Sequence, residues 1–450
     1  MQTWRNPNIK SFAQNVPDFV SGKSTPRDFL ERCIDTIKAR DKTVQAFVTL
    51  NLKAARKAAD NATQRYREGA PLSPIDGCPV GIKDIIATAD MPTQMNSPVF
   101  EGWQSGQDAA CVHALRLGGA VIIGKTVTTE FAIARSGPTT NPFDAARTPG
   151  GSSSGSAAGV GAGMIPVALG SQTQASTLRP ASYCGAVGFK STLGALHMAG
   201  IHPLSASADH LGVIGATLDD VWRTASQISL GVGSPGYGFL DGAGALPPAT
   251  KPRQLIRLYG RGFDEIDNAI AAQFEQTVDA LARTGVDIVS RDNNADVAAL
   301  EQELINDVDG SLDIVGYEMK WPFADYIARY SELIGERIHG LVKRAQLMKP
   351  AEYQALLATR TRLRARWRDV LAAAGADGYI TLASSGPAIK GLEYTGSRTF
   401  LIYASWLGVP AFSLPLLALD GLPFGVQLLG APNRDGALAA RANWMTQEIR

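Results

Sequence analysis

The chain has 450 residues, and its 43 lysines and arginines nearly balance 42 acidic residues, which gives a formal net charge of +1. Nucleic-acid-binding proteins carry a clustered basic excess, whereas charged residues here make up 19% of the chain and are mixed in sign along it. The composition therefore argues against nucleic acid and against an anionic membrane surface as partners. A hydrophobic share of 45% is ordinary for a globular protein with a large core.

The positions of the cysteines and histidines argue against a disulfide framework and against a metal site. The four cysteines stand far apart without a CxxC pair, a pattern typical neither of a disulfide framework nor of a zinc site. The five histidines include no HExxH pair, so no metal is expected. The first residues, MQTWRNPNIK, lack the apolar segment of a signal peptide. These observations predict a cytoplasmic protein without metal or cofactor.

The first elements predicted along the chain are helices within residues 24–70. Ser24 is a candidate N-cap, and apolar residues repeat every four positions from Phe29 onward, which indicates one buried helical face. A second helix, rich in alanine and arginine, is expected over residues 52–68. The chain therefore begins with a helical region.

Short apolar runs typical of strands then alternate with helical patterns. PVGIKDII begins at Pro79, GAVIIGKT at Gly119 and RQLIRLYG at Arg253. A helix with one apolar face is predicted over residues 264–284, immediately before the extended run VDIVS. This alternation predicts a fold of the α/β class.

Residues 296–373 differ from the segments before them. Their pattern is mostly helical and richer in charge and aromatic residues, as in YEMKWPFADYIARY, and the later runs GYITLASSGP and PAFSLPL have strand character. No linker rich in serine and proline and no internal repeat divides the chain. We therefore predict a single domain over residues 1–450, with residues 296–373 as a helical cover on the substrate side.

Two short motifs match known functional patterns, but the neighbouring sequence does not fit the structure that each pattern requires. Residues 119–126 match GxxxxGK[ST], but the supposed phosphate loop contains an apolar, strand-like run. Residues 151–155 match the GxSxG nucleophile elbow, but the preceding loop, NPFDAARTPGG, lacks the strand that this elbow requires. A hydrolase triad that uses one of the histidines is therefore the weaker alternative chemistry.

Glycine and serine concentrate in PGGSSSGSAA, from Pro149 to Ala158, and a second polar segment, GSQTQASTLRPASYCG, begins at Gly170. A flexible linker can have such a composition, but the flanking RTP and a helix of small residues favour an ordered loop. With GIKD at Gly81, these motifs make the sequence similar to the amidase signature family, hydrolases of carboxamide C–N bonds. The resemblance runs from about Ser24 to the C-terminus.

The resemblance implies a Ser-Ser-Lys triad in which Lys83 is the base, Ser152 the relay and Ser176 the nucleophile. It implies an α/β fold with a mixed central β-sheet covered by helices on both faces, and it places the signature core in residues 79–215. The implied activity is hydrolysis of a small carboxamide through an acyl-enzyme, without metal or cofactor. The expected partner is the amide substrate, and a homodimer is left open as a further expectation.

Residue chemistry agrees with these roles. A serine hydroxyl becomes a good nucleophile when a base takes its proton, and a lysine serves as that base near neutral pH when burial lowers its pKa. Lys83 follows the apolar run PVGI, which favours burial, although a solvated lysine at a strand end is the alternative. The resemblance also implies a cis peptide bond before Ser152, whose hydroxyl would then reach both Lys83 and Ser176.

The oxyanion of the tetrahedral intermediate is expected to accept backbone N–H groups from Thr173, Gln174, Ala175 and Ser176, again by resemblance. Most relatives have two glycines where this chain has Gln174 and Ala175. A side chain at a position that needs positive φ costs about 1–2 kcal/mol. This departure predicts an altered pocket and keeps a non-catalytic relative as an alternative.

Arg179 follows the proposed nucleophile by three residues. In relatives selective for acidic amides, an arginine at this position is implicated in binding a substrate carboxylate, which suits its two-donor fork. The alternative, which we favour, is that Arg179 braces the loop through backbone carbonyl groups. Substrate choice is expected to depend on residues 91–100, 296–373 and 384–398.

A second interpretation lies within the same resemblance. The chain would then be the catalytic subunit of a tRNA-dependent amidotransferase, which needs partner chains to function. Ammonia release by the purified chain alone would favour the independent amidase.

Overall fold

The computed structural model describes residues 3–239 and 241–449. Its strands form one mixed, eleven-stranded sheet in the order β1-β3-β2-β4-β6-β5-β10-β11-β9-β7-β8. The strands are β1 Phe47–Leu50, β2 Pro79–Lys83, β3 Val121–Thr126, β4 Val167–Gln172, β5 Val187–Lys190, β6 His210–Gly215, β7 Gln254–Arg257, β8 Asp287–Val289, β9 Tyr379–Leu382, β10 Ala411–Leu419 and β11 Leu422–Leu429.

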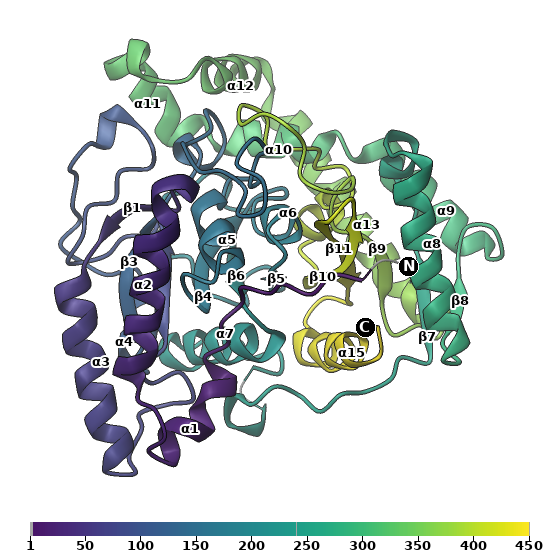
Figure 1. The fold of residues 1–450 in the computed structure, drawn as a ribbon. Coiled ribbons are helices and arrows are strands. Elements are labelled where there is room, and N and C mark those ends of the chain that lie inside the picture. Colours follow the sequence, from purple (N-terminus) through teal and green to yellow (C-terminus); the bar gives the residue numbers. More distant parts are fainter. Residues whose placement is uncertain (1–2, 240, 450) are drawn as a thin grey trace.

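Helices cover both faces of this sheet, as predicted. Figure 1 shows α5 and α6 above the central row of strands and α7 and α15 below it. The α-helices of the described residues are α1 Val16–Val20, α2 Pro26–Val44, α3 Leu52–Arg67, α4 Ala110–Leu117, α5 Ser154–Gly161, α6 Leu178–Tyr183, α7 Leu218–Val232, α8 Asn268–Arg283, α9 Ala295–Asp307, α10 Gly310–Glu318, α11 Lys320–Tyr330, α12 Glu336–Leu347, α13 Pro350–Ala373, α14 Ile402–Trp406 and α15 Asp435–Glu448.

The start of α2 differs by one residue from the sequence prediction. Thr25, rather than Ser24, caps this helix: its Oγ1 accepts the N–H of Asp28, and the Asp28 carboxylate accepts the N–H of Thr25, both at 3.0 Å. The reason is the position of the acidic residue, because this reciprocal arrangement needs an acceptor three residues after the cap.

The centre of the sheet positions the candidate site. Strand β2 lies parallel to both β3 and β4, and every residue of these three strands is buried. Burial on both faces explains their nearly continuous apolar sequences. Because parallel strands end at the same edge of a sheet, Lys83 at the end of β2 lies beside Ser171 near the end of β4.

The GxxxxGK[ST] match is part of this sheet and not a phosphate loop. Residues 121–126 form β3, and Lys125 is fully buried. Its Nζ donates to the Ile86 carbonyl oxygen at 2.8 Å and to Thr93 Oγ1 at 2.6 Å. The lysine therefore has partners within the protein core, and the sequence-based rejection of a nucleotide site is consistent with the fold.

Residues 295–373 form α9 to α13, in agreement with the helical pattern predicted for this region. In Figure 1, α10, α11 and α12 lie above α5 and α6, on the same side of the sheet. No helix in the described part of the chain combines the length and the apolar character that spanning a membrane requires.

Candidate active site

Lys83 is fully buried at the end of β2. Its Nζ donates hydrogen bonds to Ser152 Oγ at 2.6 Å and to Ser171 Oγ at 2.8 Å. Burial holds the pKa of Lys83 well below its usual value, and the Asp209 carboxylate opposes this with a smaller effect. The environment therefore favours the neutral amine.

Ser152 lies in a tight loop directly before α5. Gly150 has a φ of +79°, and a Cβ atom there would lie 2.9 Å from the Cα of Pro180, so only glycine fits. The peptide bond between Gly151 and Ser152 is cis, as the resemblance implied. The Ser152 carbonyl oxygen also accepts the N–H of Thr129 at 3.2 Å.

Ser176 lies in the loop between β4 and α6. Its carbonyl oxygen accepts the N–H of Ser153 at 3.1 Å, which joins this loop to the one that carries Ser152. On the other side, Gln172 Oε1 accepts the N–H groups of Thr177 and Leu178, both at 3.0 Å. Both loops are therefore fixed to each other and to the end of β4.

The backbone N–H groups of Thr173, Gln174, Ala175 and Ser176 donate to no acceptor among the described residues. They remain available for a negatively charged oxygen in the cavity. Neither Gln174 nor Ala175 has a positive φ. The steric cost considered for side chains at these two positions therefore does not arise, because the loop takes a conformation open to any residue.

One contact expected from the relay is not formed. Ser152 Oγ is hydrogen-bonded to Lys83, but the structure places no hydrogen bond between the hydroxyls of Ser152 and Ser176, both of which it describes. Ser176 is half-buried at the cavity wall. Because no described residue holds its hydroxyl, its χ1 angle is free to rotate among staggered positions.

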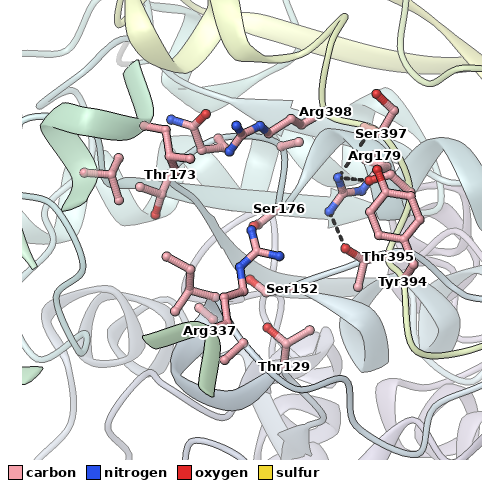
Figure 2. Close-up of a pocket in the computed structure, with 18 of the residues that line it drawn as sticks. Thr129, Ser152, Thr173, Ser176, Arg179, Arg337, Tyr394, Thr395, Ser397 and Arg398 are labelled. Carbon is pink, nitrogen blue, oxygen red and sulfur yellow. Dashed lines mark hydrogen bonds between the residues drawn. The ribbon is translucent and has the colours of Figure 1, made fainter. Parts of the chain in front are cut away.

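Ser152 and Ser176 line one cavity of about 490 Å³, with residues 173–175 and Arg179 also in its wall. This volume is in the range of small-molecule sites. The helical cover contributes Leu312 and Val315 from α10 and Arg337 from α12, and the segment before α14 contributes residues 393–399. Figure 2 shows several of these side chains around the opening.

Arg179 is 6% exposed, and both terminal nitrogens of its guanidinium are hydrogen-bonded within the protein. It donates to the carbonyl oxygens of Gly396 at 2.7 Å, Ser397 at 3.3 Å and Gly151 at 2.6 Å, and to Thr395 Oγ1 at 2.9 Å. Burial lowers the pKa of Arg179 to about 10. Dashed lines in Figure 2 mark contacts of this guanidinium within the pocket wall. The geometry favours the bracing role over substrate binding.

Replacing Arg179 by leucine is expected to lower kcat/KM by about tenfold or more on neutral and acidic amides alike, because the loop of Ser152 loses its support. The free energy of unfolding should fall by roughly 2–4 kcal/mol, since buried carbonyl groups lose a charged donor. Urea denaturation and kinetics with one amide of each kind measure both effects. Selective loss on acidic amides, with unchanged stability, would contradict the bracing role.

Three residues at this site were not singled out from the sequence. Ser171 is the second partner of Lys83, and its place in the GSQTQAS motif could have indicated it. Arg337 and Arg398 line the cavity, and both lie in segments expected to govern substrate choice. Nothing in the sequence indicated that these two arginines line the cavity, because a charged residue on a helix or loop is usually solvated.

The aromatic residues Trp321, Phe323 and Tyr326 do not line the cavity of Ser176. Trp321 is 75% exposed, Phe323 is buried, and Tyr326 stacks on Phe131 with ring centroids 5.5 Å apart. Phe323 and Tyr326 therefore pack in or near the core. Among the described residues, no three His, Cys, Asp or Glu side chains form a group that could hold a metal ion.

A family model described as Amidase matches residues 28–439. The chain belongs to the amidase signature family. The match covers the signature loops as well as the helical cover, so the whole sheet with its inserted helices is the family fold.

Relatives within the family include components of glutamyl-tRNA(Gln) amidotransferase. The matching component from Symbiobacterium thermophilum is 30% identical over 96% of this chain and 95% of its own length. Its counterpart from Chloroflexus aggregans is 37% identical over 53% of this chain, an alignment that spans 49% of that protein.

Among solved structures, the peptide amidase of Stenotrophomonas maltophilia has a TM-score of 0.82 and 25% identity, covering 99% of this chain and 98% of that one. The glutamyl-tRNA(Gln) amidotransferase component from Thermotoga maritima has a TM-score of 0.76 and 25% identity, covering 97% and 95%. The relatives thus comprise hydrolases and amidotransferase components, and the chain is an enzyme of one of these two kinds.

Proposed function

We propose that this protein is a serine amidase that hydrolyses the C–N bond of a small carboxamide. The observation that carries this proposal is the hydrogen bond of 2.6 Å between the buried Lys83 and Ser152. Ser152 lies in the wall of the same cavity as Ser176. A desolvated amine beside a chain of hydroxyls can act as a general base, because its pKa is lowered toward the working pH.

The first step joins Ser176 to the substrate. Rotation of Ser176 about χ1 brings its hydroxyl to Ser152. The Ser152 hydroxyl then gives its proton to the neutral Lys83 and takes the proton of the Ser176 hydroxyl. The Ser176 Oγ then forms a bond to the amide carbon, and the electron pair of the C=O bond moves onto oxygen. The free N–H groups of residues 173–176 stabilise this oxyanion.

The second step releases the amine. Protonated Lys83 returns its proton through Ser152 to the leaving nitrogen, the C–N bond breaks, and ammonia or an amine departs. Water then attacks the acyl-enzyme with the same base, and Ser176 regains its proton as the carboxylic acid leaves. Ser171, the other hydrogen-bond partner of Lys83, keeps the amine oriented throughout.

The test is ammonia release by the purified chain from aliphatic, aromatic and dicarboxylic amides, with no other protein present. We expect turnover of at least one class by the wild type and none by a Ser176→Ala control. Absence of ammonia from every amide would argue against an independent amidase.

A second candidate is the catalytic component of a tRNA-dependent amidotransferase, favoured by the 30% identity with the Symbiobacterium thermophilum protein over 96% of this chain. Such a protein would transfer ammonia to a tRNA-bound amino acid only with its partner chains. Amide-nitrogen transfer to charged tRNA once those partner chains are added, with negligible hydrolysis by the chain alone, would favour this candidate.

A further inference from the structure

Two arginines that line the cavity of Ser176 make no ion pair and no side-chain hydrogen bond among the described residues. Arg337, on α12, and Arg398, in the segment before α14, both line the cavity. Neither makes an ion pair or a side-chain hydrogen bond within residues 3–239 and 241–449, although both are described. Figure 2 shows their side chains extending across the pocket, whereas Arg179 turns to Thr395. Their donors are therefore free for a ligand.

The positive charges in this cavity also repel one another. Burial lowers the pKa of Arg398, and the nearby Arg337 lowers it further. Arg398 and Arg337 in turn lower the pKa of Arg179, after the larger effect of burial. Arginine does not lose its proton in proteins, so the three guanidinium groups remain charged. A bound anion would relieve this repulsion.

The carboxylates of the cavity wall do not neutralise Arg398. Glu265 accepts hydrogen bonds from Ser397 Oγ at 3.0 Å and from Thr399 Oγ1 at 2.8 Å, and it makes no ion pair with Arg398. Glu393 also lines the cavity and is exposed. Asp309, which forms an ion pair with Arg261, raises the pKa of Arg398 without pairing with it. No carboxylate of the described residues therefore forms an ion pair with Arg398.

We propose that the substrate carries a carboxylate besides its amide, and that Arg398, assisted by Arg337, binds this carboxylate while Ser176 attacks the amide. This inference rests on the proposed amidase function and adds the substrate class. The planar guanidinium presents two parallel N–H donors that match the two oxygens of a carboxylate. A cavity of about 490 Å³ accommodates a short acid with an amide at its other end.

The first test compares glutaramate, which has a carboxylate, with pentanamide, which has the same chain length without it. The wild type should show a kcat/KM for glutaramate about tenfold or more above that for pentanamide, as expected for charge-assisted hydrogen bonds. In Arg398→Leu this ratio should fall to about one, and Arg398→Lys should give an intermediate ratio because it retains charge without the fork.

The matched control is Arg329→Leu, on α11. Arg329 is exposed, pairs with Asp325 at 3.1 Å and does not line the cavity. This variant should keep the wild-type ratio. An equal ratio in the wild type and in Arg398→Leu, or a wild-type preference for pentanamide, would overturn the inference.

A binding measurement separates this inference from the proposed function. Calorimetry with glutarate, in which one carboxylate replaces the amide, requires no turnover. Binding that weakens about tenfold or more in Arg398→Leu and not in Arg329→Leu would support the carboxylate site even if no amide is hydrolysed. Glutarate binding of equal strength in the wild type and Arg398→Leu, or no binding to the wild type at millimolar concentration, would refute it.

Discussion

Ser176→Ala is expected to reduce amide hydrolysis by about six orders of magnitude, in line with loss of the nucleophile in serine hydrolases. Thr173 also carries a hydroxyl in the cavity wall, but that hydroxyl donates to Asp209 at 2.6 Å, whereas the Ser176 hydroxyl makes no hydrogen bond to a described residue. The free energy of unfolding should change by less than about 0.5 kcal/mol, because the Ser176 hydroxyl is half-buried and makes no hydrogen bond to a described residue.

Ammonia release and urea denaturation of the same preparation measure both quantities. Ser153→Ala is the matched control: Ser153 is next to the relay serine, but among the described residues its Oγ forms hydrogen bonds only with the backbone of Ser171, at 3.3 and 3.4 Å. It should lose less than about tenfold in kcat/KM, as for one neutral hydrogen bond. Residual activity above a few per cent in Ser176→Ala, with unchanged stability, would assign the nucleophile elsewhere.

Lys83→Ala and Lys83→Arg should each reduce kcat/KM by about a thousandfold or more, because general-base catalysis is lost. Arginine fails although it keeps a positive charge, since it does not deprotonate near neutral pH. If Lys83→Arg retained a rate close to that of the wild type, Lys83 would be a structural charge and not the base.

The pH profile tests the same role in the wild type. Burial lowers the pKa of Lys83, so the amine is neutral above that lowered pKa and protonated below it. The kcat/KM should therefore be constant on the alkaline side and fall as the pH decreases through the pKa of Lys83. A profile that instead continues to rise up to the ordinary lysine pKa of 10.5 would show that Lys83 is not desolvated in solution.

Local sequence patterns predicted much of the central sheet. The apolar runs at Pro79 and Gly119 became buried strands because burial on both faces demands uninterrupted apolar residues. Local patterns did not predict the order of the strands, which is β1-β3-β2-β4-β6-β5-β10-β11-β9-β7-β8. It depends on pairings between segments far apart in the chain, for which strand patterns alone give no partner.

The candidate site also has a part that the sequence predicted and a part that it did not. The cis bond before Ser152 and the contact of Lys83 with Ser152 followed from long motifs, whose residues are fixed by one local geometry. The substrate side did not follow, because Arg337 and Arg398 come from a helix and a loop with no motif of their own. Arg179, the candidate taken from the motif, proved to have both terminal nitrogens hydrogen-bonded to Gly151 and residues 395–397.

The bonds of Arg179 also set an order in which the protein can assemble during translation. Arg179 joins the loop of Gly151, 28 residues away, to Gly396, 217 residues away along the chain. Because N-terminal segments emerge from the ribosome and fold first, the two signature loops are synthesised long before the segment that closes the pocket over them. A nascent chain thus carries Lys83 and both serines before it can enclose a substrate, and hydrolysis must await the synthesis of the segment around Gly396.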